Sequence, residues 1–117
     1  MKIKGYTLHG DYYLADKVIT CTNWEEACKM KEVITLPNGK MVVAHILSKE
    51  ELGTIPRKER GNRSCWYWTS TSDSDMSTWF VSLFGDFGKL DGCFYSGDGG
   101  ARLGFYKNET KQLLDIE

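Results

Sequence analysis

The sequence lacks a hydrophobic run long enough to cross a membrane, which takes about 20 consecutive apolar residues. It has 117 residues, of which 41% are hydrophobic, so it can bury one real core. Residues 1–5 alternate charged and apolar side chains and offer no apolar signal region. The sequence therefore predicts one globular domain over residues 1–117, without membrane contact and with a cytoplasmic location.

The sequence also lacks a strong net charge, because 15 basic residues oppose 16 acidic ones. A general nucleic-acid binder normally carries a basic excess, so we do not expect nucleic acid as a partner. The charges are nevertheless clustered, which predicts a basic patch at one end of the molecule and an acidic one at the other, unless both are ordinary solvated loops. The basic cluster is Arg57, Lys58, Arg60 and Arg63, and the acidic one is Asp73, Asp75, Asp86, Asp91 and Asp98.

The cysteines lack the C-x-x-C spacing of zinc sites. They are Cys21, Cys28, Cys65 and Cys93. We expect reduced thiols, no metal and no cofactor; a Cys65–Cys93 disulfide stays open for an oxidising compartment. A cysteine nucleophile assisted by His9 or His45 also stays open, although nothing in the local sequence points to one.

Local signals predict helices and hairpins in the first half of the chain. A strand pair surrounds Gly10, and the turn residues 37–39 separate strands at 32–36 and 40–46. The capping-box pattern at 22–25 predicts a helix from about Asn23 to Met30, with Thr22 as its cap and with Trp24, Ala27 and Cys28 on the buried face. A second such pattern at 48–51 predicts a short helix through Leu52, followed by a basic loop at 56–63.

The second half reads as a glycine-rich antiparallel meander. The period of two places Trp79, Val81 and Leu83 on one face of their strand and Phe80 and Phe84 on the other. The aromatic side chains exceed what one sheet face needs, so we expect some of them to form an exposed patch, unless helices and loops cover both faces. The four predicted strands are 65–70, 77–84, 89–95 and 101–106, and residues 107–117 form a further short turn, a strand or a flexible tail.

The order of these signals resembles a known family. The quoted motifs are Thr-x-Trp-x-Glu-Ala at 22–27, Tyr-Trp-Thr-Ser-Thr at 67–71 and Gly-Ala-Arg-Leu-Gly-Phe at 100–105. They resemble the small bacterial and phage C-type-lectin-like domains of unassigned function, which are distantly similar to formylglycine-generating enzymes and to retroelement variable proteins. The resemblance implies an α+β fold with two short helices packed on a twisted antiparallel sheet.

The sequence departs from the sugar-binding lectins of this fold. Their calcium triplets, Glu-Pro-Asn or Gln-Pro-Asp and Trp-Asn-Asp, do not occur in this chain. The aspartates could supply oxygen ligands but form no recognised calcium loop. An equivalent of the reactive cysteine pair of the oxygen-using relatives is not obvious either, so we expect neither calcium nor enzymatic activity.

These observations favour a non-enzymatic recognition domain that acts by protein–protein binding. The phage-like resemblance suggests a protein that binds and blocks a host factor, such as a defence nuclease. The alternative is a carbohydrate- or receptor-binding module of a cell surface or virion, and a phage structural protein of this kind would be virion-associated. The expected surface comprises the loops 71–77, 85–88 and 96–100, with the basic cluster as a secondary patch. Its expected ligand-binding residues are Asp73, Asp75, Trp79, Asp86, Phe87, Tyr95 and Asp98.

Overall fold

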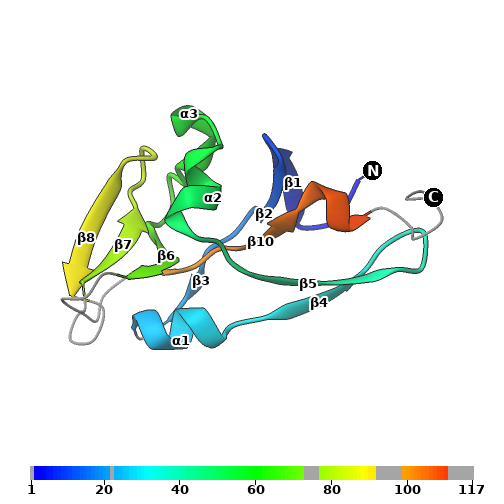
Figure 1. Cartoon of the computed structure of the whole chain (residues 1–117), viewed down its shortest axis with the longest axis horizontal. Coiled ribbons are helices and arrows are strands. Elements are labelled where there is room, and N and C mark those ends of the chain that lie inside the picture. Colours follow the sequence, from blue (N-terminus) through cyan, green and yellow to red (C-terminus); the bar gives the residue numbers. More distant parts are fainter. Residues whose placement is uncertain (1, 22, 73–76, 92–98, 111–117) are drawn as a thin grey trace.

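The computed structural model describes residues 2–21, 23–72, 77–91 and 99–110. These residues form a small α+β domain of 45 × 26 × 25 Å with three short α-helices and two five-stranded sheets (Figure 1). The α+β class is confirmed. The expected arrangement of two helices on one sheet is wrong, because the chain divides its strands between two sheets and adds a third helix.

The first sheet is antiparallel throughout and has the order β1-β2-β10-β5-β4. Both predicted hairpins belong to it, and each turns at a glycine with positive φ, Gly10 at +61° and Gly39 at +87°. Strand β10 lies between the hairpins, so the C-terminal part of the chain joins two N-terminal pairs. The strands are β1 (Tyr6–His9), β2 (Tyr12–Ala15), β10 (Leu103–Tyr106), β5 (Met41–Ile46) and β4 (Glu32–Thr35).

The second sheet contains the meander and has the order β3-β9-β6-β7-β8. Strands β6, β7 and β8 are antiparallel neighbours, whereas β9 runs parallel to β6 and pairs through Tyr67 and Gly100. The expectation of a four-stranded meander is therefore wrong for the last strand. The strands are β3 (Ile19–Thr20), β9 (Gly100–Ala101), β6 (Tyr67–Ser72), β7 (Ser77–Val81) and β8 (Phe87–Asp91).

The last described strands pass from one sheet to the other at Arg102. This residue separates β9 from β10, and only 5% of its surface is exposed. Its Nε donates to the carbonyl of Ala15 at 2.7 Å, and its Nη1 donates to the carbonyl of Arg60 at 3.1 Å. Because a buried charge needs such acceptors, the arginine ties the crossing segment to the β2 strand end and to the helical region around Arg60.

The two predicted helices are present, but the N-cap of the first one is not the predicted residue. In α1 (Trp24–Lys29) the cap is Asn23, whose side chain accepts from the Glu26 amide at 3.0 Å. The predicted cap Thr22 lies outside the described residues. In α2 (Lys49–Gly53) the capping box of Ser48 and Glu51 is confirmed, with bonds of 2.9 and 3.1 Å.

A third helix, α3 (Arg57–Arg60), replaces the predicted basic loop. Its amides at Glu59 and Arg60 donate to the carbonyl of Pro56 at 2.9 and 3.1 Å. Pro56 is the N-cap of α3, and a proline at the start of a helix loses no backbone hydrogen bond. The described tail continues as a 3₁₀ turn, Lys107–Thr110.

Buried side chains form two clusters, one on each side of the β6–β7 pair. Trp68, Leu103 and Phe105 belong to the cluster beside α1, and Tyr67 and Val81 belong to the one beside α2. Figure 1 shows α1 on the opposite side of the molecule from α2 and α3. Both faces of the meander are thus partly covered, which leaves fewer aromatic faces for a partner than the sequence suggested.

Candidate binding cleft

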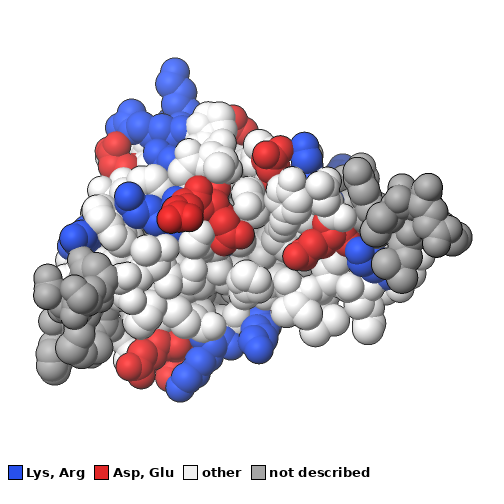
Figure 2. All heavy atoms as spheres, in the orientation of Figure 1, with Lys and Arg blue, Asp and Glu red and all other residues white. Residues whose placement is uncertain are grey.

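A cleft of about 450 Å³ lies between α3 and the β7–β8 turn, residues 82–86. Figure 2 shows lysine and arginine side chains gathered over α3. The cleft therefore combines positive charge from one element with apolar side chains from the other. Its lining residues are Arg57, Lys58, Gly61, Arg63, Leu83 and Phe84.

Two glycines allow the two walls of this cleft to touch. Gly85 has a φ of +93°, and a Cβ there would lie 2.1 Å from the carbonyl oxygen of Arg57. A Cβ at Gly61 would lie 2.5 Å from the carbonyl oxygen of Leu83. Real Cβ contacts are never this short, so only glycine permits the backbone of the turn to pack against α3.

Ser82 closes the turn that presents the apolar wall. Its amide donates to the carbonyl of Asp86 at 2.8 Å, and its hydroxyl accepts from the amides of Phe84 and Asp86 at 3.3 and 3.0 Å. Serine hydroxyls stabilise turns in this way. The backbone that carries Phe84 is therefore held by the turn itself.

Arg60 joins the turn to the helical region. Its Nε donates to the carbonyl of Gly85 at 2.9 Å. Its Nη1 lies 3.3 and 3.4 Å from the carbonyls of Leu52 and Ile55, and its guanidinium carbon lies 4.3 Å from the ring centre of Phe87. The guanidinium of Arg60 is thus engaged by contacts within the chain. It stabilises the cleft and is not available to a partner.

Arg57, which lines the cleft, forms a bidentate ion pair with Asp86 of the turn. The Nε–Oδ1 and Nη2–Oδ2 distances are 2.7 and 3.1 Å. The hydrogen bond from Arg57 lowers the pKa of Asp86, and the same bond raises the pKa of Arg57. The predicted separation of basic and acidic ends is wrong at this point, because Asp86 lies against the basic cluster.

The remaining cations of the cleft face solvent beside exposed apolar groups. Lys58 and Arg63 are exposed and have no ion-pair partner among the residues that the structure describes. Phe84 is 70% exposed and Leu83 is 38% exposed. Charge and apolar area are therefore both available to a partner at one place.

The two aromatic residues expected to contact a ligand are covered by cations of the same chain. Nζ of Lys49 lies 4.3 Å from the ring centre of Trp79, and Nζ of Lys89 lies 5.0 Å from it. Phe87 lies under Arg60 and within 5.4 Å of Lys49. Because cation–π contacts occupy these ring faces, Trp79 and Phe87 are poorly placed as apolar anchors.

Two described parts of the expected loop surface lie at opposite ends of the β7–β8 hairpin. In the β7–β8 register Ser77 pairs with Asp91 and Val81 pairs with Phe87. The turn at 85–88 therefore lies at the other end of the hairpin from Ser77, about 13 Å away along the strands. Four expected site residues, Asp73, Asp75, Tyr95 and Asp98, lie outside the described residues.

Phe80 lies on the face opposite Val81, as the alternation predicted, but that face is covered, whereas Leu83 departs from the alternation. Phe80 packs against Trp66 with ring centres 5.2 Å apart, so it does not form an exposed patch. Strand β7 ends at Val81, which leaves Leu83 in the turn and partly exposed instead of inward. Phe84 is the outward aromatic that the alternation did identify.

The histidines and cysteines have structural surroundings. His9 Nδ1 lies 3.3 Å from a carboxylate oxygen of Glu59, and His45 Nδ1 lies 2.9 Å from the carbonyl of Ile46. Burial raises the pKa of Cys21 to about 11 and also raises that of Cys28, which disfavours a reactive thiolate.

The described cysteines also bear on metal binding and disulfides. Cys21, Cys28 and Cys65 form no disulfide with one another, and Cys93 lies outside the described residues. Within the described part of the chain, no group of three or more histidine, cysteine or acidic side chains could hold a metal ion. The donor arrangement needed for a metal centre is therefore not found among these residues.

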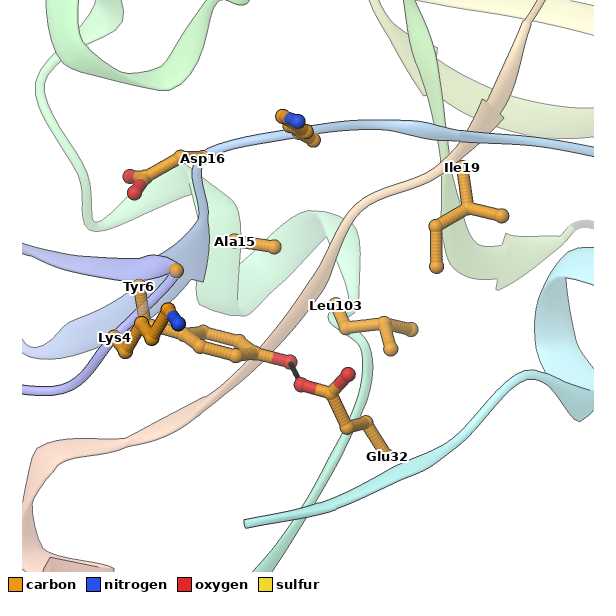
Figure 3. Close-up of a pocket in the computed structure, with 9 residues that line it drawn as sticks. Lys4, Tyr6, Ala15, Asp16, Ile19, Glu32 and Leu103 are labelled. Carbon is orange, nitrogen blue, oxygen red and sulfur yellow. Dashed lines mark hydrogen bonds between the residues drawn. The ribbon is translucent and has the colours of Figure 1, made fainter.

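A second pocket of about 450 Å³ lies near the edges of the first sheet. Figure 3 shows Tyr6 pointing toward Glu32, beside Leu103 and Ala15. The Tyr6 hydroxyl donates to Oε1 of Glu32 at 2.8 Å and so links β1 to β4, the two edge strands. This bond joins the two edge strands of the sheet at the pocket, which both residues line.

Comparisons with known proteins give no indication of the function of this chain. Searches with protein-family models, among curated proteins and among solved structures found no match to the chain. Among the described residues, no helix has the length and apolar character that crossing a membrane requires. The class established by the fold is a small α+β domain with two mostly antiparallel sheets.

Proposed function

We propose that this chain is a non-enzymatic recognition domain, built on a C-type-lectin-like scaffold, that binds a partner protein through the cleft between α3 and the β7–β8 turn. The observation that carries the proposal is the exposed Phe84, held on a fixed turn beside two cations without ion-pair partners among the described residues. The proposed surface replaces the expected loop surface and retains its basic cluster.

The fixed backbone supports this proposal energetically. Binding is weakened by every segment that must be ordered in the complex, and the cleft walls are already joined by Arg60, Gly61 and Gly85. Aromatic and arginine side chains are enriched among the residues that dominate protein interfaces. Phe84 and Arg63 therefore supply suitable contacts on a surface that needs little rearrangement.

The resemblance to phage domains supports a more specific role, in which the domain binds and blocks a host factor such as a defence nuclease. In that role the cleft would cover a surface that the host factor needs. Inhibition would then follow from occupancy alone, without chemistry in this domain.

The test is affinity capture with matched variants. The immobilised chain should retain a partner from the source cell, and Phe84→Ser should abolish that retention. Met41→Ser is the control, because Met41 is 61% exposed but lies on β5, away from the cleft. Equal retention by the Phe84 variant and the parent chain would contradict the proposal.

A further inference from the structure

We infer that the partner presents an acidic segment carrying one large apolar side chain, which occupies the cleft with its carboxylates toward Lys58 and Arg63 and its apolar group against Leu83 and Phe84. This inference rests on the proposed function and states the chemistry of its partner. It follows from the arrangement of charge and apolar area within one small cleft.

The charge of the cleft favours carboxylates. Asp86 offsets the charge of Arg57, so Lys58 and Arg63 provide the positive excess. Both are exposed, and neither meets an acidic side chain within the described residues. A partner segment with two or three carboxylates would match this excess, whereas a basic segment would be repelled.

The small number of basic side chains in the cleft argues against nucleic acid as the partner. Proteins that bind duplex DNA strongly make about 6–10 phosphate contacts, and the affinity comes largely from those contacts. Three basic residues line this cleft, and one of them is engaged by Asp86. The whole chain also has a net charge of −1, so no broad positive field extends the site.

The apolar wall gives the site a second requirement. Leu83 and Phe84 expose apolar surface that a purely acidic segment would leave in contact with water. A volume of about 450 Å³ lies within the range of pockets that bind small ligands, so it has room for one large side chain. One leucine-sized or larger side chain between the carboxylates would therefore add affinity that charge alone does not supply.

The experiment uses the full chain and labelled peptides of about ten residues, a length that a surface groove can contact. The first peptide has glutamates around one leucine, the second replaces leucine by serine, and the third replaces the glutamates by lysines. An oligothymidylate of about ten nucleotides is the fourth probe. Fluorescence anisotropy gives the affinities, and amide chemical shifts identify the residues contacted.

The glutamate–leucine peptide should bind at residues 57–63 and 83–86 and should bind about tenfold more tightly than the serine peptide. The double variant Lys58→Glu/Arg63→Glu should lose at least about tenfold in affinity. Its control is Lys29→Glu/Lys31→Glu, which makes the same change in charge at exposed positions on the α1 side. Raising the salt from about 50 to about 300 mM should weaken the parent complex several-fold.

Each contrary result contradicts a different part of the inference or of the proposed function. Equal binding of the leucine and serine peptides would overturn the apolar requirement, and preference for the lysine peptide would overturn the charge requirement. Absence of peptide binding, with capture of a protein partner still lost in Phe84→Ser, would overturn the inference and leave the proposed function standing. Tighter binding of the oligothymidylate would overturn both, because the partner would then be a nucleic acid.

Discussion

The two hairpin turns at Gly39 and Gly85 have the same local conformation and different tertiary roles. Their φ angles are +87° and +93°. A Cβ at Gly39 would meet nothing within 4 Å, whereas one at Gly85 would lie 2.1 Å from the Arg57 carbonyl oxygen. The β4–β5 turn therefore needs glycine only for its φ angle, and the β7–β8 turn needs it also to dock on α3. The turn sequence indicates the requirement for a positive φ angle. It does not indicate the requirement for docking on α3, which depends on a distant segment.

The largest expected effect separates these two requirements directly. Gly85→Ala should lower the free energy of unfolding by about 3 kcal/mol, because the new methyl group would overlap backbone atoms of α3 in addition to the positive-φ strain. Gly39→Ala should lower it by only about 1 kcal/mol, the strain alone. Urea unfolding of the two variants measures both values. Equal losses would mean that docking on α3 contributes nothing to the stability of the turn.

A smaller effect is expected from the side chain that holds the docked turn. Arg60→Met keeps much of the apolar stem but removes the hydrogen bonds to Gly85, Leu52 and Ile55, and should lower the free energy of unfolding by about 2 kcal/mol. Arg60→Lys is the matched control, since it keeps the charge near Phe87 without the planar fork. Its loss should be intermediate. Hydrogen exchange should accelerate in the β7–β8 turn and stay unchanged in the β4–β5 turn; acceleration in both would contradict a local role.

Local sequence chemistry predicted the elements whose causes are local. The capping box at Ser48 and the turns at Gly10 and Gly39 follow from residues within four positions of each other. The transfer of β10 to the first sheet could not be predicted this way, because it depends on Arg102 reaching carbonyls 87 and 42 positions earlier. Periodicity identified these residues as a strand but carries no information about which sheet receives it.

The candidate site shows the same limit. The basic cluster and the outward Phe84 were identified from spacing and alternation. The pairing of Arg57 with Asp86 joins residues 29 positions apart, and the covering of Trp79 by Lys49 joins residues far apart in sequence. Whether an aromatic or charged side chain is available to a partner depends on such contacts, which composition alone does not show.

The smallest expected effect concerns the ion pair between the docked turn and α3. Arg57 stabilises the ionised form of Asp86, so its folded-state pKa lies below the ordinary value for aspartate. The stabilisation from this pair is therefore present above that ordinary pKa and is lost as the pH falls through the lower, folded-state value. Both side chains are largely exposed, so water and salt screen the pair and its effect on unfolding should be slight.

The carboxyl carbon shift of Asp86, followed by NMR during acid titration, measures this pKa directly. Arg57→Gln should return it toward the ordinary aspartate value, whereas Lys40→Gln, beside the β4–β5 turn, should leave it unchanged. An Asp86 pKa that does not move in Arg57→Gln would mean that the Arg57–Asp86 pair does not help to hold the turn. In that case Arg57 would keep its full charge for a partner, and Arg57→Gln should weaken the acidic peptide as strongly as removing Lys58 or Arg63.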